Sequence, residues 1–372
     1  MSIRRRQRAD GHVVWQVLWR DPDGRQRSET KLTRREAERR EREISELRWQ
    51  DRLDQVDAGA EPLTQATDRW WSEHAKPNLA RSTLKSYAQI LDCHLLPRLG
   101  DSPIRDIQPA TVVTLQRDMG AEGIGGPTVH RTLMVLSSIL RHAVLCGRID
   151  RNPVGPVRVK RPRRQRAIRP LPPADVEQLR AALLARDDQA SAVLVCVMAY
   201  AGLRPGEATA LAWEHIGDRT ILVERSNDQE GEVVQTKTGV IRTVRLLDPL
   251  AEDLAAWRAA NDDLSPSQPL VPRADGRGWN IDDYKNWRRR RFDPAVNDAG
   301  LERTRPYDLR HSFASLMIQA GFSPVELAAE LGHAPTLTLD TYSHVFSEFA
   351  RGERVDPEGA IFRARDARIP RK

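Results

Sequence analysis

The sequence predicts a multidomain protein: a small unit of a β-hairpin or sheet and a helix, then an all-α domain, then a mixed, mainly α domain with a small antiparallel sheet. Three observations lead to this fold class. The 372 residues are too many for one ordinary domain. Strand-like hydrophobic patterns give way to helical ones near residue 61, and a basic stretch over 158–169 interrupts the helical part. We therefore expect domains at residues 1–60, 61–157 and 170–372, joined by a linker at 158–169.

The first domain is predicted to be a basic β-hairpin followed by a helix. Residues 12–19 are rich in the β-branched and aromatic residues of strands, and residues 21–24 form a turn sequence with proline and glycine. Residues 25–31 are then the return strand. A capping-box pattern opens the helix expected over residues 33–49. A solvated, highly charged extension is the alternative.

The second domain is predicted to be all helical, because no strand-like alternation interrupts it. Pro109 and Pro127 suit the first turns of helices, and Gly120 and Gly147 suit helix ends. The expected helices cover residues 63–74, 82–97, 109–119 and 127–146.

The third domain combines short β-prone runs with helices. The β-prone runs, at residues 220–224, 232–236 and 241–247, predict a small antiparallel sheet. Helices are expected before and after it, at residues 173–185, 191–200, 249–261, 280–297, 307–320, 324–330 and 336–347.

The net charge favours a polyanionic partner. Lysine and arginine number 59 against 52 acidic residues, which gives a formal charge of +7 and a pI near 9.6. Nucleic acid and an anionic membrane surface both fit this excess. The longest apolar run, residues 192–203, has 12 residues, against the roughly 20 that a membrane span needs. We therefore expect a nucleic acid as the partner, and no membrane.

The cysteines and the N-terminus indicate a cytoplasmic, nucleoid-associated protein. The N-terminal residues do not lead into a secretory apolar segment. Cys93, Cys146 and Cys196 are odd in number and far apart, and each lies in an apolar helical pattern. We interpret them as buried free thiols in a reducing compartment.

Motifs for nucleotide and metal binding are absent from the sequence. It contains no Walker loop, no G-x-G-x-x-G, no H-E-x-x-H and no Cys/His spacing typical of zinc sites. We therefore expect chemistry that needs neither ATP nor a tightly held metal, and no cofactor.

Four segments of the third domain carry residues suited to phosphate chemistry. They lie at residues 201–207, 236–239, 306–311 and 331–345. Taken singly, each has an ordinary explanation: Arg204 could pair with a nearby glutamate, Lys237 could be a solvated hairpin lysine, and Tyr342 could be a core tyrosine.

Together, in this order and spacing, the segments resemble the active-site motifs of the tyrosine recombinases, the phage-integrase family. In that family an arginine in G-L-R-x-x-E is followed by a hairpin lysine, an arginine in H-x-x-R-H, a histidine in L-G-H and a nucleophilic tyrosine. The residues that match are Arg204, Lys237, Arg310, His333 and Tyr342, with Glu207 and His311 in the surrounding motifs. The two preceding domains look like the family's arm-binding and core-binding domains.

The resemblance implies DNA strand exchange through a covalent tyrosyl ester. Tyr342 would attack a scissile phosphate, forming a 3′-phosphotyrosyl ester and releasing a 5′-hydroxyl that later rejoins the backbone. No ATP is needed, because the ester keeps the bond energy. Arg204 and Arg310 would hold the phosphate oxygens, Lys237 would protonate the leaving oxygen, and His333 would orient the phosphate.

One position departs from the family pattern. Tyr307 stands where the family usually has the first histidine of H-x-x-R. A phenol, with an ordinary pKa of about 10, accepts a proton less readily near neutrality than an imidazole does. We expect slower chemistry, or compensation by His311 or His333. Glu207 is expected to fix Arg204.

The basic linker is interpreted as a strap across the DNA backbone, and a flexible charged linker is the alternative. Its expected DNA-binding residues are Arg158, Lys160, Arg161, Arg163, Arg164 and Arg166. The family also implies a homotetramer on two attachment sites and an accessory directionality factor. The apolar residues after Tyr342 suit docking on a neighbouring subunit or packing on their own domain.

Two other functions stay open at this point. A type IB topoisomerase shares the chemistry, although the two expected DNA-binding domains favour an integrase. A non-catalytic DNA-binding regulator would fit the helix-turn-helix appearance of residues 321–333. It would leave Arg204, Lys237 and Tyr342 without a role.

Overall fold

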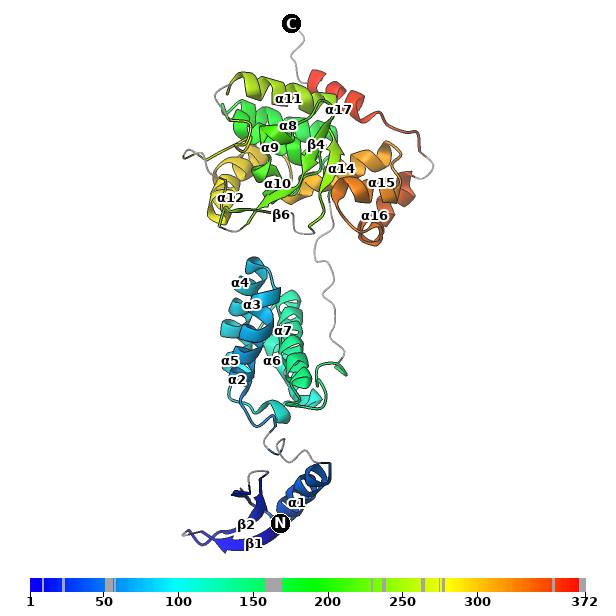
Figure 1. The fold of residues 1–372 in the computed structure, drawn as a ribbon. Coiled ribbons are helices and arrows are strands. Elements are labelled where there is room, and N and C mark those ends of the chain that lie inside the picture. Colours follow the sequence, from blue (N-terminus) through cyan, green and yellow to red (C-terminus); the bar gives the residue numbers. More distant parts are fainter. Residues whose placement is uncertain are drawn as a thin grey trace. The chain divides into compact units, whose positions relative to one another are not determined.

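The computed structural model contains two compact units, Met1–Gln165 and Arg166–Lys372, whose elements are drawn in Figure 1. It describes residues 1–8, 10–21, 24–50, 56, 58–157, 169–228, 230–235, 239–261, 265–273, 275, 278–349 and 352–367. The division between the units falls inside the predicted linker at 158–169. Its expected DNA-binding residues, Arg158, Lys160, Arg161, Arg163, Arg164 and Arg166, lie outside the described residues.

The N-terminal part is a three-stranded antiparallel sheet followed by a helix. The strands lie in the order β1-β2-β3, with bounds Ser2–Gln7, Val13–Arg20 and Gln26–Lys31. Helix α1 (Arg34–Trp49) opens with a capping box between Thr33 and Glu36. The predicted hairpin and helix are confirmed. Strand β1 was missed because it is mostly exposed and arginine-rich, and only Ile3 carries an apolar signal.

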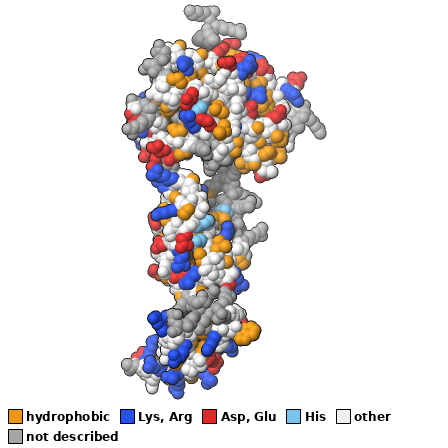
Figure 2. All heavy atoms as spheres, viewed as in Figure 1, with side chains coloured by type: hydrophobic (Ala, Val, Ile, Leu, Met, Phe, Trp, Pro, Cys, Tyr) orange, Lys and Arg blue, Asp and Glu red, His pale blue; other side chains and the backbone are white. Residues whose placement is uncertain are grey.

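Basic side chains gather over this sheet and helix, in blue on the face that Figure 2 shows. Arg4, Arg5 and Arg6 of β1 are all exposed. Val17 of β2 and Ile44 of α1 are fully buried. The apolar side chains thus hold α1 on the sheet, while the arginines stay in solvent.

The second part is all helical, as predicted. Its helices are α2 (Leu63–Trp70), α3 (Lys76–Asn78), α4 (Arg81–Ile90), α5 (Leu96–Leu99), α6 (Pro109–Ala121) and α7 (Gly126–Leu145). Two π-helical turns, η2 (Trp71–Ala75) and η3 (Leu91–Leu95), join α2 to α3 and α4 to α5, and a 3-10 turn, η4, covers Ile104–Asp106. Fully buried Trp70, Leu133 and Leu140 belong to the apolar core.

The expectation that all three cysteines are buried is wrong for two of them. Cys196 is buried, whereas Cys93 and Cys146 are exposed, and all three are free. Cys93 lies between Leu91 and Leu95 of η3, which are the buried residues of that turn. Cys146 caps the C-terminus of α7. Apolar neighbours in sequence therefore did not mean burial for these thiols.

The second unit is mainly helical around the buried helix α9 (Gln189–Tyr200). Its other helices are α8 (Pro173–Leu184), α10 (Pro205–Ala210), α11 (Asp248–Ala259), α12 (Ile281–Trp287), α13 (Asp293–Asp298), α14 (Pro306–Gln319), α15 (Pro324–Leu331), α16 (Pro335–Phe349) and α17 (Pro357–Asp366). A 3-10 turn, η5 (Trp213–His215), and a π turn, η6 (Arg288–Phe292), complete the set. Helices α8, α11 and α14 pack on α9, and Ser191 to Tyr200 are all buried. Within the residues described, no helix combines the length and apolarity of a membrane span.

The strands of this unit form two antiparallel pairs instead of the single small sheet expected. Strand β4 (Thr220–Val223) pairs with β7 (Arg242–Arg245), and β5 (Arg225–Asn227) pairs with β6 (Val233–Gln235). Strand β5 has no apolar residue that would have predicted it, because its three residues are polar. Helices α10 and α17 were not foreseen either.

The C-terminal helix α17 packs on its own unit. Ile361 is fully buried in the core, and Phe346 and Phe349 pack against that core. Arg365 forms ion pairs with Glu177 at 3.2 Å and with Asp253 at 2.6 Å. In this structure the segment after Tyr342 therefore packs on its own domain, which is one of the two alternatives considered for it.

Candidate active site

The turn between α9 and α10 carries the first predicted arginine. Gly202 has a φ of +66°, and a Cβ there would overlap the ring of Phe313, so the close approach and the backbone both require glycine. Arg204 follows as the N-cap of α10. Its guanidinium donates to Glu207 Oε1 at 2.6 Å and to the carbonyl of Gly332 at 3.1 Å.

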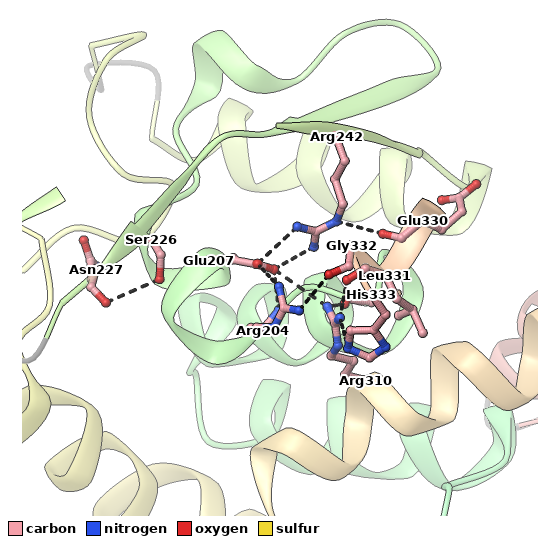
Figure 3. Close-up of polar contacts among 11 residues, drawn as sticks. Arg204, Glu207, Ser226, Asn227, Arg242, Arg310, Glu330, Leu331, Gly332 and His333 are labelled. Atoms are coloured by element: carbon pink, nitrogen blue, oxygen red, sulfur yellow. Dashed lines mark hydrogen bonds and ion pairs between the residues drawn. The ribbon is translucent and has the colours of Figure 1, made fainter. Parts of the chain in front are cut away.

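Glu207 lies among three arginines, which we call the arginine cluster: Arg204, Arg242 and Arg310 (Figure 3). Arg242 donates to both carboxylate oxygens of Glu207, at 3.1 and 2.7 Å, and Arg310 Nη1 lies 3.8 Å from Oε2. Burial alone would raise the pKa of Glu207. The hydrogen bonds and charges of Arg242 and Arg204 outweigh it and lower that pKa to about 2. Glu207 is therefore a permanent anion that holds the cations together.

Arg242 is a site residue that the sequence analysis did not name. It lies on β7, is 6% exposed, and also donates through Nε to the carbonyl of Glu330 at 2.8 Å. A signal was present: in the alternation of β7, Arg242 and Val244 are buried while Thr243 and Arg245 are exposed. An arginine at a buried strand position requires a buried anion as partner.

Arg310 lies on α14 and is 1% exposed. It donates to the carbonyl of Gly202 at 2.5 Å and to that of Leu331, and its Nη2 lies 3.0 Å from His333 Nε2. Burial, followed by the charge of Arg204, lowers the pKa of Arg310 to about 10. Among the residues that the structure describes, its Nε and the Nδ1 of His333 are buried without a hydrogen-bond partner. These two nitrogens are available to an anion.

All three arginines of the cluster donate hydrogen bonds to the C-terminal end of α15. Three consecutive carbonyls there each accept from a different guanidinium: Glu330 from Arg242, Leu331 from Arg310, and Gly332 from Arg204 (Figure 3). The last carbonyls of a helix have no partner within the helix and carry the negative end of its dipole. Gly332 ends the helix with a left-handed φ of 60°. The main-chain carbonyl oxygens of residues 330–332, which we call the carbonyl platform, therefore hold the three arginines.

His333 comes directly after this platform. Burial, and then the charges of Arg310 and Arg204, lower the pKa of His333 to about 4. At neutral pH the imidazole is uncharged. Its Nε2 accepts from Arg310, which leaves the proton on Nδ1, facing no partner.

Tyr342 lies on α16 and is 1% exposed. Its hydroxyl lies 2.6 Å from Nδ1 of His311, the residue that follows Arg310 on α14. The rings of His311 and Tyr342 meet edge to face at 5.6 Å, and the rings of His311 and Tyr307 meet edge to face at 5.4 Å. Tyr307 itself is 39% exposed.

The structure thus brings together most of the predicted site residues. Arg204, Glu207, Arg310 and His333 form one hydrogen-bonded group. Tyr342, His311 and Tyr307 form a second group on the adjoining face of α14. Lys237 lies outside the described residues, between β6 and β7.

Residues that could hold a metal lie elsewhere, in the helical part of the first unit. Among the residues described, Glu73, His142 and Cys146 place their ligand atoms within 4.8 Å of one another. His142 Nε2 already lies 3.3 Å from a carboxylate oxygen of Glu73. Glu73 and Cys146 are exposed. The contacts of His142 with Glu73 and with Cys146 Sγ account for the grouping without a metal ion.

Two family profiles match the chain. Residues 169–348 match the phage integrase family, and residues 63–160 match the phage integrase central domain. The chain belongs to the phage integrase family. The predicted class, a tyrosine site-specific recombinase, is thereby confirmed, and so is the predicted fold.

Curated relatives agree with this assignment. A Mycobacterium tuberculosis protein named for the prophage phiRv2 integrase is 26% identical over 361 residues, covering 89% of this chain and 88% of the relative. The tyrosine recombinase XerD of Caulobacter vibrioides is 28% identical over 289 residues, covering 72% of this chain and 88% of the relative.

Solved integrase structures share the fold. The Tn1549 transposon integrase in complex with transposon right end DNA has a TM-score of 0.67 at 19% identity, covering 78% of this chain and 98% of that one. The lambda integrase tetramer bound to a Holliday junction has a TM-score of 0.59 at 18% identity, covering 89% and 95%.

Proposed function

We propose that this recombinase is an integrase that cleaves and rejoins double-stranded DNA at attachment sites, with Tyr342 as the nucleophile. The observation that carries the proposal is the meeting of two groups on consecutive residues of α14. Arg310 belongs to the arginine cluster, and His311 holds the hydroxyl of Tyr342 at 2.6 Å. A nucleophile and an excess of positive charge therefore lie side by side.

The arginine cluster suits a phosphate. Three guanidinium groups and one carboxylate leave two positive charges in excess. Arg310 Nε and His333 Nδ1 are buried donors with no partner in the described part of the chain, and a phosphate oxygen would accept from both. Nη1 and Nη2 of Arg310 donate to main-chain oxygens, and Nη2 also lies 3.0 Å from His333 Nε2, so the guanidinium is oriented before substrate arrives.

The reaction forms and breaks one phosphorus–oxygen bond at a time. The phenolic oxygen of Tyr342 bonds to the scissile phosphorus and the 5′-oxygen leaves, taking a proton from Lys237. The 5′-hydroxyl of the partner strand then attacks the phosphotyrosyl ester and releases Tyr342. Because each ester replaces another, no nucleotide cofactor is needed.

The assembly we propose is a homotetramer on two DNA sites at the nucleoid, with an accessory factor setting direction. The lambda integrase tetramer on a Holliday junction is a relative in fold that supports this stoichiometry. The arginine-rich β1 would contact phosphates at sites apart from the crossover, and the basic linker residues between Arg158 and Arg166 would cross the phosphate backbone of the duplex.

A covalent-adduct assay tests the proposal. Wild-type protein, Tyr342→Phe and the control Tyr284→Phe are incubated with labelled duplexes from the region flanking the gene, without metal or ATP. Denaturing gels should show an adduct with wild type and Tyr284→Phe and none with Tyr342→Phe. DNA shifts without any adduct would favour a non-catalytic regulator, and relaxation of unrelated supercoiled DNA would favour a topoisomerase.

A further inference from the structure

The attack by Tyr342 requires a proton acceptor, and position 307 does not supply the usual imidazole. A phenol becomes an effective nucleophile only as it loses its proton. Tyr307 is 39% exposed and presents a second phenol, which is no base near neutral pH. The acceptor must therefore be another group close to the hydroxyl of Tyr342.

Glu207 and His333 are both unsuited to this role. The carboxylate of Glu207 is engaged by Arg204 and Arg242, which stabilise its charged form and make it a weak base. The Nε2 lone pair of His333 accepts from Arg310, so that nitrogen cannot take a second proton donor. Both side chains are instead hydrogen-bonded to guanidinium groups of the arginine cluster.

His311 has the geometry that the step needs. Its Nδ1 lies 2.6 Å from the hydroxyl oxygen of Tyr342, which is within the reach of a general base. Its ring is in edge-to-face contact with both Tyr307 and Tyr342, at centroid distances of 5.4 and 5.6 Å. Tyr307 precedes it by four residues on α14, the spacing at which helical side chains touch. The imidazole is thus held in one orientation.

We propose that His311 accepts the phenolic proton of Tyr342 during strand cleavage and returns it during strand joining. The inference rests on the proposed function. In cleavage the O–H bond of Tyr342 breaks as an N–H bond forms at Nδ1, while the phenolic oxygen bonds to phosphorus and the 5′-oxygen leaves. In joining, the released phenolate takes the proton back from Nδ1. Tyr307 is then a positioning residue, whose ring holds the imidazole and whose hydroxyl is dispensable.

Single-turnover cleavage tests this role, with a flanking duplex on which wild type forms an adduct. The variants are His311→Ala, His311→Asn and the control His344→Ala, an exposed histidine two residues after the nucleophile. Asparagine keeps a hydrogen-bond acceptor near the position of Nδ1 but cannot take up a proton. We expect both His311 variants to form the adduct about 100- to 10,000-fold more slowly. His344→Ala should match wild type, and gel shifts should be unchanged for all three.

Two further measurements separate a proton acceptor from a structural residue. Added imidazole should partly restore cleavage by His311→Ala. A duplex with a 5′-bridging sulfur at the mapped scissile position has a leaving group that needs no proton. It should rescue Lys237→Ala but not His311→Asn, because the proton of the attacking phenol remains.

The outcomes distinguish this inference from the proposed function. If wild type forms no adduct, the proposed function itself fails. If wild type reacts and His311→Asn reacts at the same rate, His311 only shapes the site and the inference is overturned. Rescue of His311→Asn by the 5′-bridging sulfur would overturn it as well. Should His311→Ala melt at a much lower temperature, the asparagine variant carries the test.

Discussion

Two buried groups of arginines and carboxylates in the second unit have opposite charge balances. The arginine cluster has three guanidinium groups around Glu207. The other group, which we call the balanced cluster, pairs Arg180 and Arg365 with Glu177 and Asp253 where α8, α11 and α17 meet. The first holds two positive charges in excess, and the second holds none.

The pKa values of the arginines follow this difference. Burial opposes the charge of Arg365, but Asp253 and Glu177 outweigh it and raise its pKa. At Arg310, burial and the charge of Arg204 act in the same direction and lower the pKa to about 10. A structural ion cluster neutralises its charges, whereas a site for a phosphate keeps a deficit of negative charge for the substrate to fill.

The largest effect should come from matched lysine substitutions in the two clusters. Arg310→Lys removes the oriented Nε donor that we propose binds the phosphate, and should slow adduct formation by about 1,000-fold, with little change in melting temperature. Arg365→Lys should leave adduct formation within about 3-fold of wild type and lower the melting temperature instead. Equal activity losses in the two variants would remove the functional distinction between the clusters.

Next in size is the removal of a carboxylate from the balanced cluster. Asp253→Ala leaves Arg180 and Arg365 with too little negative charge and should destabilise the folded protein by about 3 kcal/mol in urea unfolding. The exposed Asp282 is the matched control, and Asp282→Ala should change stability by less than about 0.5 kcal/mol. Adduct formation by the remaining folded Asp253→Ala protein should be normal.

Arg242 should affect the reaction indirectly. Arg242→Met keeps the apolar stem but releases Glu207, on which Arg204 depends, so adduct formation should fall about 10- to 100-fold. Because Arg242 touches no substrate in our proposal, DNA affinity in gel shifts should be unchanged. Normal cleavage by this variant would mean that Arg204 is positioned without Glu207.

The smallest effect concerns acid stability. The pKa of His333 is lowered from an ordinary 6.5 to about 4, so the unfolded chain binds a proton that the folded chain rejects. Stability should therefore be full above pH 6.5 and fall by about 2 kcal/mol as the pH drops from about 6.5 to about 4, after allowing for partial exposure. Urea unfolding of wild type and His333→Gln over this range checks it. The variant should lack this part of the pH dependence.

The fold and most of the candidate site could be predicted from the sequence, because both depend on local patterns. Arg204, Arg310, His333 and Tyr342 lie in short motifs whose residue types carry the chemistry. Arg242 has no such motif, since its role depends on an anion 35 residues away in the chain. The pairing of His311 with Tyr342 depends on how α14 packs against α16, which is a tertiary contact that no local pattern specifies.

Other differences between the predicted and the observed structure also have local causes. The three π turns, η2, η3 and η6, each add a residue to a helical turn without a compositional signal. Strand β1 has arginines where a strand usually shows apolar alternation. Cys146 was expected to be buried, but it lies at the C-terminal end of α7, where its side chain is exposed.

The end of α15 determines which mutations the arginine cluster can tolerate. Its three acceptors are the carbonyls of Glu330, Leu331 and Gly332, and every amino acid supplies a carbonyl. Substitutions at positions 330 and 331 therefore do not remove an acceptor carbonyl. Gly332 is the exception, because its left-handed backbone excludes most side chains and a Cβ there would press on Arg242 at 3.1 Å. Among residues 330–332, Gly332 is therefore the position at which a substitution would disturb the arginines proposed to bind phosphate.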